Sequence, residues 1–134
     1  MNARTVALAL ASAVTTFLLV GAATIALSAT QFGDSPGVGI LGVFAGVLGG
    51  LLALVLVAAF GGRLSGAPVA ALVGYGTFGV AFLGIAGLSY VNVPGADAVF
   101  TFPVHLGTSA VLAVVAAAAA FARRGRPLRT DPSV

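Results

Sequence analysis

The sequence predicts an all-α integral membrane protein, folded as an antiparallel bundle of four transmembrane helices. The chain has 134 residues, of which 60% are hydrophobic and only 7% are charged. A soluble domain of this size needs far more charge to stay dissolved. Four apolar segments each exceed the roughly 20 residues that a helix needs to cross a hydrocarbon core about 30 Å thick. The short connections between them make neighbouring helices antiparallel, which gives one compact domain.

The predicted spans cover residues 5–29, 37–60, 67–90 and 98–122, within a single transmembrane domain of residues 1–122. The first apolar segment is longer than the core of a cleaved signal peptide, so we expect it to remain as a helix. Residues 123–134 form a short basic tail. We expect this tail to fix the orientation of the chain, and docking of a cytoplasmic partner is the alternative. The absence of Lys and Glu indicates a GC-rich prokaryotic genome.

The arginines predict the topology. Arg4 precedes the first span, Arg63 lies between the second and third, and Arg123 and Arg124 follow the fourth. In a chain that crosses four times, these places lie on one side of the membrane. The other two connections carry Asp and no Lys or Arg. The positive-inside rule then places both termini in the cytoplasm and the protein in the cell membrane.

An internal repeat relates the first two spans to the last two. A shift of 61 residues without gaps pairs Thr16 and Phe17 with Thr77 and Phe78, and also pairs a Leu-Ser and an Ala-Ala-Phe run. The same shift pairs His105 with Phe44 and Gly46 with Gly107. We interpret this as a duplicated helical hairpin with a pseudo-two-fold axis along the membrane normal. The alternative is a compositional bias that all membrane helices share.

Glycines mark the predicted helix-packing interface. In the second span Gly42, Gly46 and Gly50 recur every four residues, and the third span contains Gly74 and Gly79. The hydrophobic effect does not hold helices together in lipid, so close contact through small residues supplies the attraction. These glycines serve internal packing or leave one face for a second copy or a partner membrane subunit.

A proline and the single histidine interrupt the fourth span. If Thr101 caps this helix, Pro103 falls in the first turn, where its missing N–H would be unpaired in any case. The alternative is a helix that is capped by Asp97 and kinked at Pro103.

A polar face follows this proline. Thr101, His105, Thr108 and Ser109 have the spacing of one helix face, which we expect to point into the bundle or toward a water-filled vestibule. The structural interpretation gives His105 a hydrogen bond to Asn92, Tyr90 or a hydroxyl of its own helix. The functional interpretations are a cofactor site, with His105 as a haem or metal ligand, and a pH-sensitive latch. A lone histidine needs symmetry mates or another subunit to complete such a site.

Other hydroxyl groups lie deeper in the spans. Ser12, Thr15, Thr16 and Thr77, with Tyr75, fall near the middle of the first and third spans. Hydroxyls in membrane helices usually donate to a carbonyl one turn back, so we expect these to be satisfied within their own helices. In the alternative, Thr16 and Thr77 line a small polar path along the pseudo-axis.

The spans contain no Asp, Glu, Lys or Arg. Proton-coupled transporters and pumps generally keep such a residue inside the membrane, so this absence argues against them. The G-x-G-x-x-G pattern of residues 37–42 lies in a membrane span with no preceding strand, so it does not predict a nucleotide site. We find no catalytic constellation, metal site, resident cofactor or nucleic-acid-binding pattern, and we expect that the protein is not an enzyme.

Three functions remain compatible with this sequence. The first is a structural or accessory membrane subunit that acts through glycine-lined helix contacts. The second is a passive channel or facilitator for a small neutral solute, with the polar face as its vestibule. The third, less favoured because haem-binding bundles usually contain several histidines, is a haem-binding subunit that uses His105.

Overall fold

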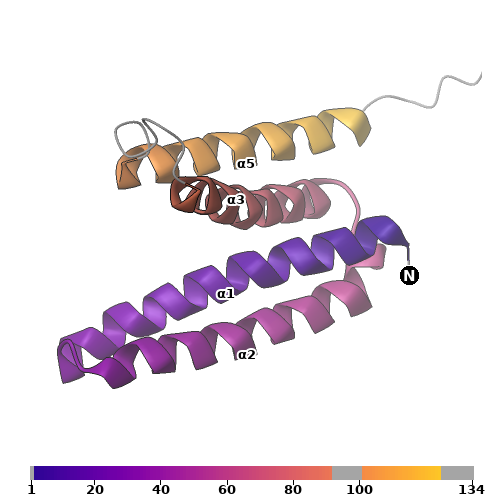
Figure 1. Cartoon of the computed structure of the whole chain (residues 1–134). Helices are drawn as coiled ribbons and strands as arrows, with labels where there is room; N and C mark the ends of the chain where they lie inside the picture. Colours follow the sequence, from indigo (N-terminus) through magenta and orange to yellow (C-terminus); the bar gives the residue numbers. More distant parts are fainter. Residues whose placement is uncertain (1, 92–100, 125–134) are drawn as a thin grey trace, which may run out of the picture.

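The computed structural model describes residues 2–91 and 101–124, and it contains four long helices (Figure 1). They are α1 (Ala3–Phe32), α2 (Pro36–Phe60), α3 (Ala67–Tyr90) and α5 (Phe102–Arg124), with a 3-10 turn, η1 (Gly61–Arg63), after α2. Each long helix has the length and composition to cross a membrane. The predicted all-α class with four spans is confirmed. The predicted cap Asp97 and the tail from residue 125 onward lie outside the described residues.

The first helix is capped at both ends by its own sequence. The side-chain oxygen of Asn2 accepts a hydrogen bond of 2.9 Å from the backbone N–H of Thr5. At the other end α1 continues three residues past its predicted end and stops at Gly33. This glycine has a φ of 62°, which side chains disfavour, and its N–H donates to the Ala29 carbonyl at 3.0 Å.

The last helix begins later than its predicted start at residue 98. It starts at Phe102, and the N–H of His105 donates to the Thr101 carbonyl at 2.9 Å. Pro103 therefore lies in the first turn, where a proline removes no intrahelical hydrogen bond. The prediction that the helix begins after Thr101 is confirmed, and the alternative of a helix kinked at Pro103 is wrong.

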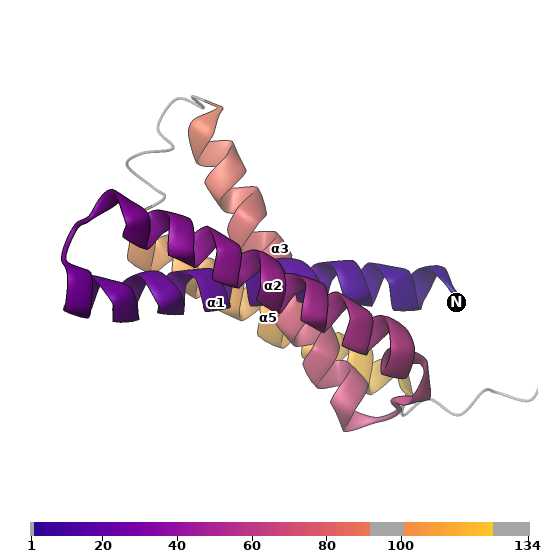
Figure 2. The same ribbon diagram turned by 90° about the horizontal axis from the view of Figure 1, so that it is seen from below.

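The helices lie in the order α2, α1, α3, α5 across the bundle (Figure 1). Helix α1 packs against α2 along its length, and α3 packs against α5. The two hairpins meet where α1 crosses α3 at a wide angle, which is clear when the bundle is turned (Figure 2). The crossing leaves the end of α3 that precedes residue 91 projecting away from the other helices (Figure 2).

Small residues fill the contacts between helices. The largest side chains that are fully buried are Thr15, Ser12 and Ser109, whereas most Leu, Ile, Val and Phe side chains are exposed. This distribution is the reverse of that in a soluble protein and suits a chain whose surroundings are as apolar as its side chains. Close helix packing by small residues therefore determines where the helices meet.

The contact between the hairpins falls on positions that the repeat pairs with each other. Thr15 and Gly76 are 61 residues apart, both are buried, and they touch across the α1–α3 crossing, with the Thr15 Oγ1 atom 3.5 Å from the Gly76 carbonyl oxygen. A two-fold axis brings a position against its own counterpart. This contact agrees with the pseudo-axis, which stays a prediction.

The outer helices follow the repeat in a different register. Gly42 packs on the Gly21 carbonyl in the first hairpin, and His105 meets the corresponding Phe82 carbonyl in the second. Likewise Gly50 of α2 packs on Ala13 of α1. In the second hairpin Ala113 of α5 packs on Gly74 of α3, which is the counterpart of Ala13. His105 thus matches Gly42, and the ungapped pairing of His105 with Phe44 is wrong by two positions.

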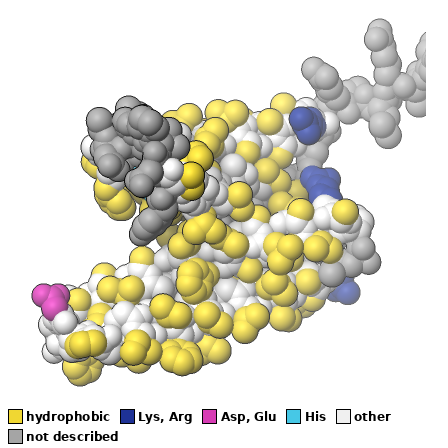
Figure 3. Space-filling model, viewed as in Figure 1, with side chains coloured by type: hydrophobic (Ala, Val, Ile, Leu, Met, Phe, Trp, Pro, Cys, Tyr) yellow, Lys and Arg dark blue, Asp and Glu magenta, His cyan; other side chains and the backbone are white. Residues whose placement is uncertain are grey.

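Charge is segregated along the bundle axis. Arg4 lies in the first turn of α1, Arg63 ends η1 and Arg123 lies near the end of α5, and these positions fall at one end of the molecule. Asp34, the one acid among the described residues, lies in the α1–α2 connection at the opposite end (Figure 3). The apolar helices separate a basic end from an acidic end.

Candidate functional site

The crossing of α1 and α3 is held by a buried threonine. Thr15 is 0% exposed, and its hydroxyl lies 2.8 Å from the Tyr75 carbonyl of α3 and 3.0 Å from the Ala11 carbonyl of its own helix. Thr15 lies about 18 Å along α1 from its start, so this contact is near the middle of a core about 30 Å thick. It ties the two hairpins together at mid-depth, with an interhelical bond that the sequence did not predict.

Two glycines of α3 allow this close approach. A Cβ atom at Gly76 would lie 2.8 Å from the Ala11 Cβ atom, and one at Gly79 would overlap the Thr15 side chain. Any larger residue at these positions would push the helices apart. Gly79, which the sequence placed in a packing interface, thus packs against α1.

A second hydrogen-bonded pair lies beside the first. The Thr16 hydroxyl is 2.8 Å from the Ser12 carbonyl and 2.8 Å from the Tyr75 hydroxyl. Since Thr16 donates its single proton to the carbonyl, Tyr75 donates to Thr16. Thr77 donates to the Val73 carbonyl at 2.7 Å, as expected for a hydroxyl in a membrane helix.

Ser12 differs from these neighbours. Its hydroxyl is buried and has no hydrogen-bond partner among the described residues. An unpaired hydroxyl in an apolar interior costs free energy. Ser12 therefore contributes its small size to the crossing and does not contribute a bond.

His105 is anchored to α3. Its Nε2 atom lies 2.6 Å from the Phe82 carbonyl oxygen, and its ring stacks on the Phe82 ring with centroids 4.1 Å apart. Because a carbonyl only accepts, Nε2 carries the proton and donates. The hydroxyls of α5 are not the partners of this ring nitrogen, since its partner is a backbone carbonyl one helix away. The side chain of Tyr90 lies outside the part of the chain that the structure describes. Asn92 lies outside the described residues.

The predicted polar face divides in two. Ser109 is 0% exposed and donates to the His105 carbonyl at 2.9 Å, so these two residues face α3. Thr101 and Thr108 are exposed. The four residues therefore do not line one common vestibule, because Ser109 is buried whereas Thr101 and Thr108 are exposed.

The geometry of His105 bears on ligand binding. The Nε2 atom, which could otherwise bind a metal, is engaged with the Phe82 carbonyl. Among residues 2–91 and 101–124, no group of three or more His, Cys, Asp or Glu side chains could hold a metal ion. The arrangement therefore favours a structural role for this histidine.

The glycines of α2 face α1. A Cβ atom at Gly46 would lie 2.7 Å from the Phe17 carbonyl oxygen, and one at Gly42 or Gly50 would lie 3.0 Å from a carbonyl oxygen of α1. Gly74 contacts α5 in the same manner, with a Cβ atom 3.0 Å from that of Ala117. These glycines take up the close contacts inside the chain.

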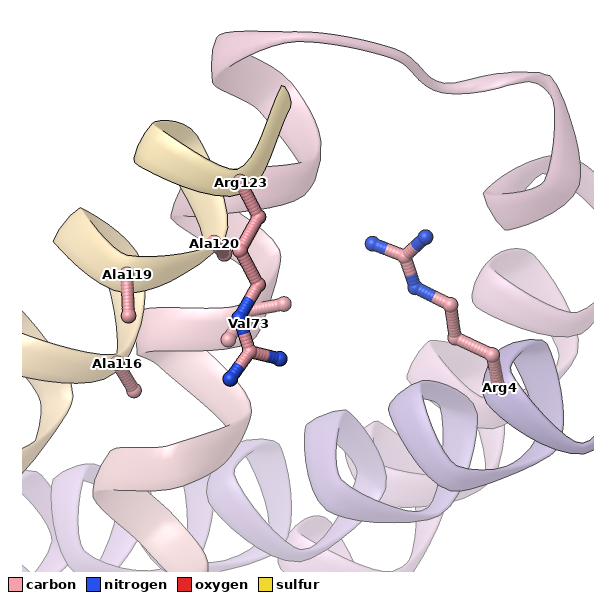
Figure 4. A pocket seen from close by; sticks show the side chains of 6 residues that line it. All are labelled: Arg4, Val73, Ala116, Ala119, Ala120 and Arg123. Atoms are coloured by element: carbon pink, nitrogen blue, oxygen red, sulfur yellow. The ribbon is translucent and has the colours of Figure 1, made fainter. Parts of the chain in front are cut away.

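A cavity opens at the basic end, between α1 and α5. It has a volume of about 640 Å³ and is lined by Arg4, Val73, Ala116, Ala119, Ala120 and Arg123. The guanidinium groups of the two arginines extend from α1 and α5 toward this space (Figure 4). An apolar wall with two fixed positive charges at its mouth suits an anionic group attached to an apolar body.

Comparison with known proteins adds one relationship. A family model described as Domain of unknown function (DUF8147) matches residues 2–120. The chain belongs to this family. The matched range covers α1, α2 and α3 in full and α5 as far as residue 120. No curated protein and no solved structure matches the chain.

Two parts of this family member's site were missed at the level of sequence. Phe82 as the partner of His105 depends on the register of α5 against α3, which the ungapped repeat misplaced. Arg4 of α1 and Arg123 of α5 line one cavity, whereas the sequence indicated only that both lie on the same side of the membrane. The repeat with a register shift of two residues would have identified the first contact.

Proposed function

We propose that this protein is a structural or accessory subunit of the cell membrane that binds a second copy or a partner membrane protein and catalyses no reaction. The glycines that pack inside the chain do not serve this binding. The proposal rests on a different set of glycines, which meet no described residue.

The observation that carries the proposal is an open glycine face on α3. A Cβ atom at Gly84 or Gly87 would have no described atom within 4 Å. Leu88 is exposed beside these glycines, toward the end of the helix that projects from the bundle (Figure 2). Glycine lowers helix stability, and in membrane helices its usual benefit is close approach of another helix. An approaching helix would supply that benefit here.

The orientation follows from the charges. Arg4, Arg63 and Arg123 lie at the end that the positive-inside rule assigns to the cytoplasm, and the tail adds further arginines. We infer that both termini are cytoplasmic. The projecting end of α3 then lies in the outer leaflet.

The alternative functions have weaker support. A facilitator needs polar groups that are free to bind a solute, but the hydroxyls of Thr15, Thr16 and Thr77 donate to backbone carbonyls. Haem ligation through the Nε2 atom of His105 would first have to break its bond to Phe82.

The test is native mass spectrometry of the full chain after mild extraction. We expect the wild type to appear as a multiple of the 13.0 kDa chain or with the added mass of a partner. Gly84→Leu and Gly87→Leu should release the free chain, because the added side chains would block the approaching helix.

Gly39→Leu is the matched control. Gly39 is also a helical glycine without a described neighbour within 4 Å, but it lies on α2. This variant should assemble as the wild type does. A free wild-type chain, or equal assembly of all three variants, would contradict the proposal.

A further inference from the structure

The cavity at the basic end continues into a groove between α1 and α3. The groove has a volume of about 420 Å³ and shares Arg4 and Val73 with the cavity. Its other walls are Ala7, Leu8, Ala11, Gly76, Thr77, Val80 and Ala81. It follows α1 for about 10 Å, from Arg4 to Ala11, toward the middle of the membrane. A charged mouth thus leads into an apolar groove that reaches about two thirds of the way to the middle of a core about 30 Å thick.

Neither arginine at the mouth has an acidic partner in the part of the chain that the structure describes. Asp34 is at the opposite end of the bundle, and no salt bridge occurs among these residues for Arg4 or Arg123. Arginine stays protonated in proteins and binds phosphate oxygens through two parallel N–H donors. Two such groups facing one space would attract a phosphate at the membrane surface, by about 1 kcal/mol per arginine.

Arg63 shows the contrast at the same end. Its guanidinium group lies over the Phe60 ring, 5.7 Å from the ring centroid, and it lines neither the cavity nor the groove. The position of Arg63 therefore satisfies the positive-inside rule without any binding site. Arg4 and Arg123 have the same effect on topology but also share a cavity.

We propose that this cavity binds the headgroup of an anionic phospholipid of the cytoplasmic leaflet. Arg4 and Arg123 hold the phosphate from two sides, and one acyl chain lies in the groove along α1 and α3. Arg4 belongs to the first hairpin and Arg123 to the second, so the bound lipid bridges the hairpins on the cytoplasmic side of their crossing. This site is independent of the open glycine face in the outer leaflet.

The experiment measures lipid binding to the full chain by native mass spectrometry. The protein is titrated with phosphatidylglycerol and with phosphatidylcholine of the same acyl chains. We expect tighter binding of phosphatidylglycerol by the wild type. Arg4→Gln and Arg123→Gln should each weaken that binding about fivefold, which corresponds to about 1 kcal/mol per arginine near the surface. Arg63→Gln removes the same charge from the same end and should leave the affinity unchanged.

A second pair of variants tests the groove without changing charge. Ala81→Phe places a ring in the groove and should weaken binding of phosphatidylglycerol, whereas Ala118→Phe changes an exposed alanine of α5 that lines neither space. Inorganic phosphate alone should bind far more weakly than the lipid.

The proposal is overturned if all three arginine variants bind phosphatidylglycerol equally, because the effect is then general surface charge. Competition by inorganic phosphate at the affinity of the lipid would replace the lipid with a free anion. Equal binding by Ala81→Phe and Ala118→Phe would remove the groove from the site. None of these outcomes depends on the assembly state, so they leave the proposed function to its own test.

Discussion

The two hairpins solve the same packing problem by different means. In the first, Gly42 brings its backbone against the Gly21 carbonyl, and the contact is made by close approach alone. In the second, the equivalent position is His105, whose side chain reaches the Phe82 carbonyl and stacks on its ring. At this position the first interface depends on the absence of a side chain and the second on a specific one, although the second also contains a glycine contact at Gly74.

This difference determines how each interface tolerates change. A glycine contact between backbones leaves no space for a side chain, so any substitution forces the helices apart. A histidine anchor contributes a hydrogen bond and a ring contact, which can be removed one at a time. We therefore expect a single substitution in the first hairpin to cause a large loss in the free energy of unfolding, and substitutions in the second to cause smaller, stepwise losses.

The largest effect is expected from Gly46→Leu. The new Cβ atom would lie 2.7 Å from the Phe17 carbonyl, and neither helix backbone can move aside without losing other contacts. We expect a loss of about 3 kcal/mol in the free energy of unfolding, at the upper end of the cost of overpacking. Unfolding by SDS in mixed micelles measures this loss.

Gly39→Leu serves as the comparison for Gly46→Leu, because the Cβ atom at Gly39 has open space. It should unfold at the same SDS fraction as the wild type or slightly above it, since leucine favours the helix. Similar losses in both variants would show that α2 does not pack on α1 through Gly46.

The packing face of the first hairpin could be predicted from the sequence, and that of the second only in part. The spacing of Gly42, Gly46 and Gly50 specifies a face without specifying its partner. Hydropathy and length predicted the spans, because the bilayer imposes both on any crossing helix. Pro103 predicted the start of α5 within one turn, because its missing N–H is tolerated only there.

The contacts of the candidate site depend on how the helices pack against one another, and the linear sequence does not show this packing. The partner of His105 is set by the register between α3 and α5, and a backbone carbonyl carries no signal in the side-chain sequence. Similarly, Arg4 and Arg123 line one cavity because the two hairpins pack against each other, and Thr15 and Gly79 lie in that contact.

A smaller effect is expected in the second hairpin from His105→Ala. This variant removes the bond to Phe82 and the stacked ring, and we expect a loss of about 1.5 kcal/mol in the free energy of unfolding. His105→Phe keeps an aromatic ring and removes only the bond, so the loss should fall to about 0.6 kcal/mol.

The same SDS unfolding assay separates these contributions, with Thr108→Val as an exposed control on α5. Equal losses for His105→Ala and His105→Phe would assign the whole contribution to the hydrogen bond. No loss in either variant would mean that the second hairpin, like the first, is held by packing of small residues.

The smallest effect is expected between the hairpins, where Ser12 and Thr15 face the same crossing. Thr15→Val keeps the shape of the side chain and removes the bond to the Tyr75 carbonyl, which should cost about 0.6 kcal/mol. Ser12→Ala removes a hydroxyl that is 1% exposed and has no partner among the described residues, so stability should stay unchanged or rise slightly. SDS unfolding of the two variants and their double mutant measures both effects and their coupling. A loss above about 1 kcal/mol in the free energy of unfolding of Ser12→Ala would show that this hydroxyl forms a hydrogen bond and that the crossing is held by more than one polar contact. The expected result leaves Thr15 as the residue that bonds one hairpin to the other.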